Sequence, residues 1–136
     1  MKDLVSKKGK SDLFYISSAA TSTEEIGNPI YPPVRKILDS RGIDYSGKTA
    51  IQVTKNDYLK YDFLICMDSL NLRNLSRIIG EDIENKVYRL LDFTNSPKDV
   101  ADPWYTGDFS ITEKEIESGC LALYQHIFKT EKINED

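Results

Sequence analysis

The chain has 136 residues, of which 40% are hydrophobic and 29% charged, with a formal net charge of −4 and a pI near 5.1. These values fit one soluble globular domain spanning residues 1–136, and the acidic balance argues against nucleic acid as a natural partner. No apolar run approaches the roughly 20 residues of a membrane span, and no signal-peptide pattern opens the chain. With only Cys66 and Cys120, neither a disulfide framework nor a zinc site is expected, which favours a reducing cytoplasm.

The first ten residues have the pattern of a helix end. Leu4 and Val5 supply an apolar face, Lys7 and Lys8 suit the negative end of the helix dipole, and Gly9 can turn left-handed. No N-cap and no first turn precede this pattern. We therefore expect the last two turns of a helix whose start is absent. The alternative is a short terminal helix of no significance.

Strands and helices are predicted to alternate along the rest of the chain. The expected extended segments are 13–16, 49–53, 61–67 and 87–93, and the apolar run at 61–67 is typical of a strand buried on both faces. The expected helices run from Pro32 to Gly42, from Asp68 or Ser69 to Gly80, and from a capping box at Thr112–Glu115 onward. The apolar face of the last helix is predicted to comprise Ile116, Cys120, Leu123, Tyr124 and Ile127. This alternation predicts an α/β fold with a parallel sheet flanked by helices.

The run V-A-D-P-W-Y-T-G-D-F at 100–109 follows the strand predicted at 87–93. Pro103 and Gly107 break regular structure, so a loop is expected. The carboxylate of Asp102 can serve as a general acid at the edge of a cleft, with Trp104 and Tyr105 as a flat wall for a planar substrate. The alternative is a surface turn whose two aromatic side chains lie in the core.

This run resembles the acid loop of the low molecular weight protein tyrosine phosphatases. Three further stretches are similar to that family in the same order: S-A-A-T-S at 18–22, the segment 27–33 that starts G-N-P, and Y-D-F-L-I-C-M-D at 61–68. The resemblance covers nearly the whole chain. It implies the family's three-layer fold and the hydrolysis of phosphate monoesters through a cysteinyl-phosphate, without a metal or cofactor.

The resemblance also implies roles for individual residues. Asp102 would protonate the leaving phenolate and later act as base toward water. Trp104 and Tyr105 would lie beside the phenyl ring, and Ser18 matches the serine that braces the phosphate loop. Substrates of the complete protein would be phosphotyrosine proteins or, as in some bacterial relatives, phosphoarginine proteins.

The family's nucleophile loop, a Cys-x5-Arg run directly after the first strand, does not occur in this sequence. Cys66 is expected in a buried strand, Arg73 follows it by seven residues rather than six, and Cys120 falls on the apolar face of the last helix. We therefore expect a chain that lacks the family's first strand and nucleophile loop and is inactive alone. In the family that strand is interior to the sheet, so its loss predicts poor stability or self-association through unpaired strands.

Two departures from the family pattern put the substrate preference in doubt. Glu24 stands where many relatives carry an aromatic residue lining the cleft, and K-T-A-I at 48–51 replaces a basic stretch. Two other functions remain open. One is a catalytically dead binding module that kept the aromatic wall. The other is a thioredoxin-coupled arsenate reductase, for which Cys66 and Cys120 are poorly placed.

Overall fold

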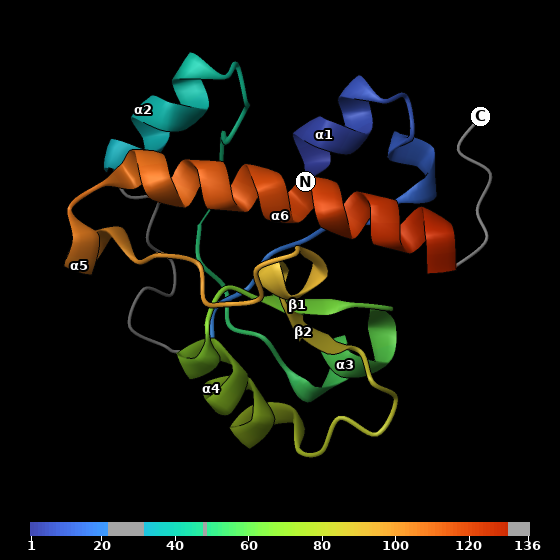
Figure 1. The fold of residues 1–136 in the computed structure, drawn as a ribbon. Helices are drawn as coiled ribbons and strands as arrows, with labels where there is room; N and C mark the ends of the chain where they lie inside the picture. The colour runs from blue at the N-terminus through green and yellow to red at the C-terminus, as the bar shows by residue number, and fades with distance from the viewer. Residues whose placement is uncertain (22–31, 48, 131–136) are drawn as a thin grey trace.

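The structure, a computed structural model, describes residues 1–21, 32–47 and 49–130. Its elements in chain order are α1 (Lys2–Lys7), the 3-10 turn η1 (Ser11–Leu13), α2 (Pro32–Ser40), α3 (Lys55–Lys60), β1 (Leu64–Cys66), α4 (Ser69–Ile79), β2 (Val87–Arg89), the 3-10 turn η2 (Leu90–Phe93), α5 (Pro103–Thr106) and α6 (Phe109–Thr130). The long helix α6 lies between α1 and α2 on one side and the strands on the other (Figure 1). Helices α3 and α4 lie on the opposite side of the strands, which gives three layers.

Strands β1 and β2 pair in parallel. Their register aligns Leu64 with Val87 and Cys66 with Arg89. A further parallel bridge joins Ala20 to Gln52. A parallel sheet flanked by helices confirms the predicted α/β fold class.

The predicted strands were too long or misplaced. Only three residues of 61–67 and three of 87–93 are strand. After Arg89 the chain turns into η2, because the Asp92 carboxylate accepts hydrogen bonds from the Arg89 amide (2.9 Å) and Nε (3.0 Å). The strand predicted at 13–16 was wrong. Residues 11–13 form η1, and Phe14 packs its ring on α6 instead of entering a described ladder.

Two predicted helices form with the expected ends. Asp68 caps α4 by accepting a hydrogen bond from the Asn71 amide (2.7 Å), and Gly80 follows the helix with φ = 80°. Helix α2 ends at Ser40, and the Ile43 amide then donates to the Leu38 carbonyl (2.9 Å). Both ends are local patterns that need no distant partner.

Two other helices differ from the prediction. Helix α3 was not predicted, although Thr54 and Asp57 form a reciprocal cap at its start. Helix α6 begins at Phe109 rather than at the proposed capping box, because Asp108 takes the capping role and accepts bonds from the Ser110 amide (2.9 Å) and hydroxyl (2.6 Å). Ile116 was wrongly placed in the core, since it is 37% exposed. None of the helices within the described ranges is long and apolar enough to cross a membrane.

Helix α6 joins the separate parts of the molecule. On the strand side it packs against η2, where Leu90 and Leu91 meet Leu123 and Ile127 in one apolar cluster. On the other side it receives α1, as Val5 packs against Tyr124 and Phe128.

Near its start α6 also contacts the segment that follows α2. Arg41 donates through Nε to Glu113 (2.6 Å) and through its terminal nitrogen to Glu117 (3.1 Å). One arginine thus bridges two carboxylates that lie a turn apart on the helix.

The contact between α6 and η2 depends on Gly119. A Cβ atom at this position would overlap the side chain of Leu90, which is only 2% exposed. Replacing a mid-helix glycine by alanine normally stabilises a helix by about 1 kcal/mol. We expect Gly119→Ala to lower the free energy of unfolding by about 1–3 kcal/mol instead, because overpacking outweighs helix propensity.

Urea unfolding followed by circular dichroism measures this effect. The control is Ser118→Ala on the exposed face of the same helix, which should leave the midpoint unchanged or raise it slightly. A Gly119→Ala midpoint equal to or above that of Ser118→Ala would contradict the proposed close packing.

Candidate functional site

The acid loop, defined here as residues 99–108, follows η2 and leads into α6. The prediction of an irregular loop was wrong in its centre, because Pro103–Thr106 form the one-turn helix α5. The Thr106 amide donates to the Asp102 carbonyl (3.2 Å) and the Gly107 amide to the Pro103 carbonyl (2.8 Å). Proline suits the first position of a helix, and Gly107 ends it with φ = 69°. Asp102 is exposed and directly precedes this turn.

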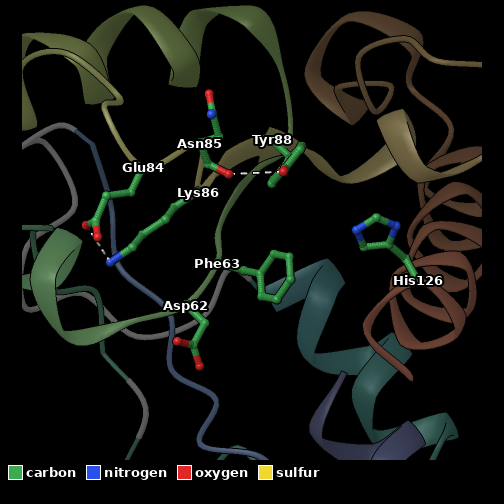
Figure 2. Close-up of a pocket in the computed structure, with 7 residues that line it drawn as sticks. All are labelled: Asp62, Phe63, Glu84, Asn85, Lys86, Tyr88 and His126. Atoms are coloured by element: carbon green, nitrogen blue, oxygen red, sulfur yellow. Dashed lines mark hydrogen bonds and ion pairs between the residues drawn. The ribbon is translucent and has the colours of Figure 1, made fainter. Parts of the chain in front are cut away.

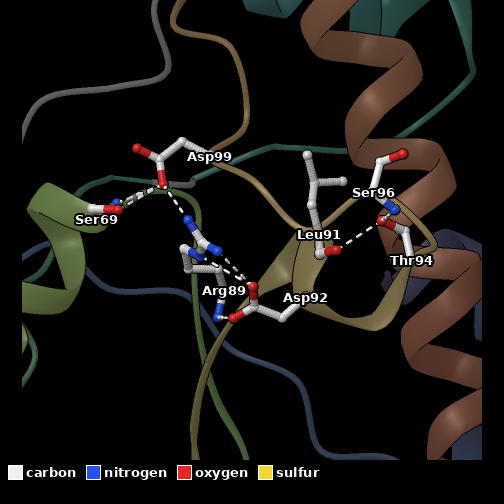
Figure 3. A network of polar contacts seen from close by, with 7 residues as sticks. All are labelled: Ser69, Arg89, Leu91, Asp92, Thr94, Ser96 and Asp99. Carbon is white, nitrogen blue, oxygen red and sulfur yellow. Dashed lines mark hydrogen bonds and ion pairs between the residues drawn. The ribbon is translucent and has the colours of Figure 1, made fainter.

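The start of the acid loop is tied to the carboxyl ends of both strands (Figure 3). One oxygen of Asp99 accepts hydrogen bonds from the Ser69 amide (2.9 Å), the Ser69 hydroxyl (2.8 Å) and a terminal nitrogen of Arg89 (3.0 Å). The Ser69 hydroxyl and the Arg89 guanidinium lower the pKa of Asp99, despite some desolvation. The Val100 amide donates to the Met67 carbonyl (2.9 Å). These bonds place Asp102 at the edge of the sheet where α/β proteins carry their ligand sites.

Helix α6 holds the residue just before Asp102. The Ala101 amide donates to Oε1 of Glu115 (2.8 Å), and the Thr112 hydroxyl donates to the Ala101 carbonyl (2.6 Å). Oε2 of Glu115 pairs with Lys98 Nζ at 3.0 Å. The Ala101 amide, and then Lys98, lower the pKa of the Glu115 carboxyl.

The sequence pattern predicts that Thr112 and Glu115 form a capping box at the start of α6, and this prediction is wrong. The same Thr-x-x-Glu spacing puts both side chains on one face of α6. There they bond the acid loop rather than their own helix.

Both cysteines lie outside the acid loop, one in β1 and the other in α6. Cys66 ends β1 with 6% exposure, and burial, followed by the nearby charge of Asp68, raises the pKa of its thiol to about 11. Arg73 is exposed on α4, seven positions later in the sequence. Cys120 is partly buried in the middle of α6. The prediction that Cys66 is a buried strand residue is confirmed.

Other proposed site residues are placed only in part. Ser18 is exposed in the segment just before the bridge at Ala20. The backbones of Trp104 and Tyr105 form α5, but their side chains lie outside what the structure describes, as do Glu24 and Lys48. The aromatic wall therefore stays a prediction.

A pocket of about 250 Å³ lies elsewhere (Figure 2). Its lining residues are Asp62, Phe63, Glu84, Asn85, Lys86, Tyr88 and His126. Apart from His126 of α6, they lie just before the strands or within β2, so the pocket lies toward the amino ends of the strands, away from Asp102. Its lysine is already engaged, since Lys86 Nζ donates to the Tyr58 carbonyl (2.8 Å) and pairs with Glu84 (3.2 Å). We therefore place the candidate site at the acid loop and not at this pocket.

Known proteins are similar in sequence to this chain. A family model described as low molecular weight phosphotyrosine protein phosphatase matches residues 1–133. The low molecular weight protein-tyrosine-phosphatase YfkJ of Bacillus subtilis is 34% identical over 134 residues, which cover 97% of this chain and 86% of the relative. A low molecular weight phosphotyrosine protein phosphatase of Mus musculus is 32% identical over 132 residues, which cover 93% of this chain and 83% of the relative.

Solved structures agree with the sequence comparison. The crystal structure of YfkJ matches with a TM-score of 0.88 and 35% identity, over 94% of this chain and 82% of that chain. The low molecular weight protein tyrosine phosphatase SP-PTP of Streptococcus pyogenes matches with a TM-score of 0.81 and 34% identity, over 96% and 82%. The chain therefore belongs to the low molecular weight phosphotyrosine protein phosphatase family.

Proposed function

We propose that this chain provides the general-acid part of a phosphatase that acts on phosphotyrosine proteins, with Asp102 as the proton donor. The observation that carries the proposal is the position of Asp102. It is exposed at the carboxyl end of the parallel sheet, and the residues before it are tied to both strands and to α6. A carboxyl group at such an edge can reach the leaving oxygen of a bound phosphate ester.

The reaction needs two further parts. A thiolate attacks phosphorus, and an arginine with backbone amides stabilises the charge on the equatorial oxygens. Within the 136 residues no arginine follows a cysteine by six positions, since Leu72 and His126 occupy those places. We propose that these residues alone do not turn over aryl phosphates and that activity requires a Cys-x5-Arg segment from additional sequence.

In a complete enzyme Asp102 would act twice. It would protonate the phenolate as the cysteinyl-phosphate forms, and the resulting carboxylate would then take a proton from the water that hydrolyses this intermediate. Trp104 and Tyr105 would contact the phenyl ring, and Ser18 would support the phosphate loop. We place the protein in the cytoplasm, because Cys66 and Cys120 are both free thiols.

The role of Asp102 predicts a strong dependence on the leaving group. In a form that carries the Cys-x5-Arg segment, Asp102→Asn should lower the turnover of phenyl phosphate by about 10²–10⁴-fold. The loss should be smaller for phenols that are more acidic, because they leave without a proton. Steady-state kinetics with a series of aryl phosphates measures both effects.

The matched control is Asp108→Asn in the same loop. The amide oxygen of asparagine can still cap α6 through Ser110, so turnover should change little. An equal loss in the two variants, or no loss in Asp102→Asn, would contradict the assignment.

The burial of the Cys66 thiol leads to a prediction about its reactivity. Because the pKa of Cys66 is raised from 9.0 to about 11, the thiolate population near pH 8 is about 100-fold below that of an ordinary cysteine. Iodoacetamide labelling followed by peptide mapping should therefore find Cys66 largely unmodified in the folded chain. In urea the same residue should react at the ordinary rate, and rapid labelling without urea would show that Cys66 is accessible after all.

We also propose that the 136-residue chain self-associates through exposed residues beside its short strand pairing. Tyr15 and Ile51 are 71% and 56% exposed in the two stretches next to the bridge at Ala20. Sedimentation velocity should show species above 15.5 kDa that diminish when either residue is replaced by lysine. A single 15.5 kDa species at all concentrations would contradict this proposal.

A further inference from the structure

Ala101, the residue directly before Asp102, is bonded to α6 through a pair of side chains, which we name the Ala101 anchor (Thr112 and Glu115). Thr112 donates to the Ala101 carbonyl at 2.6 Å. Glu115 accepts from the Ala101 amide at 2.8 Å. Both backbone polar groups of a single residue are thus bonded to one helix.

The geometry of the peptide bond makes the Thr112 contact specific for Asp102. The Ala101 carbonyl and the Asp102 amide and Cα belong to one rigid plane. A bond that fixes the carbonyl oxygen therefore also restricts the position of the Asp102 Cα. The Glu115 bond to the amide restricts the preceding plane, so the two bonds together limit rotation about both backbone dihedrals of Ala101.

Burial and an ion pair stabilise the Glu115 side of the Ala101 anchor. The Glu115 side chain is only 14% exposed, and its second oxygen pairs with Lys98 at 3.0 Å. A charged acceptor shielded from water makes a stronger hydrogen bond than a neutral one. On the upstream side Val100 is buried at 7% and its amide bonds Met67, so residues 100 and 101 are held from two directions.

We infer that Thr112 and Glu115 are positioning residues that set the location of the Asp102 carboxyl through the backbone of Ala101. The inference rests on the proposed function, because a position matters for catalysis only if Asp102 transfers the proton. Both act through the backbone of Ala101 rather than through the substrate. Their effect is to keep the carboxyl within reach of the leaving oxygen, and a displacement of about 1 Å can cost on the order of 10²-fold in rate.

The first test uses the 136-residue chain itself. Amide exchange measured by NMR should be about tenfold or more faster for Ala101 in Glu115→Ala, because the charged acceptor is lost. Trp104 is the only tryptophan, so its fluorescence anisotropy reports on α5 and should fall in both Glu115→Ala and Thr112→Val. Glu115→Gln keeps an acceptor oxygen and should restore most of the Ala101 protection.

The matched control is Glu117→Ala. Glu117 lies two positions after Glu115 on the same helix, but its carboxylate accepts a hydrogen bond from Arg41 instead of from the acid loop. This variant should leave the Ala101 amide and the Trp104 anisotropy unchanged. Urea midpoints separate a local effect from general destabilisation. If Glu115→Ala fails to fold, Thr112→Val decides the question. The inference is overturned if the loop signals in Thr112→Val, and in Glu115→Ala where it folds, equal those of Glu117→Ala.

The second test measures catalysis in the form that carries the Cys-x5-Arg segment. Thr112→Val and Glu115→Ala should lower kcat for phenyl phosphate by about 10–100-fold with little change in KM, and less for more acidic phenols. If Asp102→Asn is impaired but these variants are not, the positioning role fails and the proposed function stands. If Asp102→Asn is fully active, the proposed function fails, while the amide exchange of Ala101 still tests the anchor.

Discussion

Helix α6 approaches η2 so closely at Gly119 that any side chain there would overlap Leu90. This close packing determines how far the helix stands from the strand ends. One turn earlier on the same helix Glu115, and two turns earlier Thr112, reach Ala101 over ordinary hydrogen-bond distances. A helix displaced outward by the width of a methyl group would carry both side chains away from the acid loop. The core contact and the candidate site are therefore parts of one geometric constraint.

The acid loop is held mainly by charged groups at the carboxyl ends of the strands. Arg89 bonds Asp92 in η2 and Asp99 at the start of the loop, so one guanidinium links two turns of the chain. Asp99 in turn bonds the first residue of α4 through Ser69. Hydrogen bonds between ionised and polar groups fix direction as well as distance. Such bonds therefore define the direction of the acid loop at its start more closely than apolar packing would.

Local patterns in the sequence predicted much of the fold. The Asp68 cap, the ends of α2 and α4 and the parallel α/β class followed from neighbouring residues or from periodicity. The strand limits did not, because pairing depends on distant partners: the apolar run at 61–67 contains only three paired residues. The segment 13–16 has strand-like residues, yet Phe14 packs on α6.

In the candidate site, too, local features could be predicted from the sequence and contacts between distant residues could not. A short motif predicts Asp102 as a candidate acid and breaks in regular structure at Pro103 and Gly107, but neither the one-turn helix between them nor the residues that hold Ala101. Thr112 and Glu115 have the spacing of a capping box, and a sequence cannot tell whether such a pair bonds its own helix or another segment. Asp99 and Arg89 lie ten positions apart without a recognisable pattern. They associate only because β2 ends, and the acid loop begins, at the same edge of the sheet.

Two of the contacts that α6 makes respond differently to the solvent. Its contact with η2 is apolar and buried, so dissolved ions hardly affect it. The contact made by Arg41 is ionic, and the side chains involved are 29–64% exposed. At about 0.15 M salt, charges are screened over roughly 8 Å, and exposed ion pairs contribute little. The segment that follows α2 is therefore held to α6 most firmly in dilute buffer, and its attachment weakens as ionic strength rises while the helix beneath it stays in place.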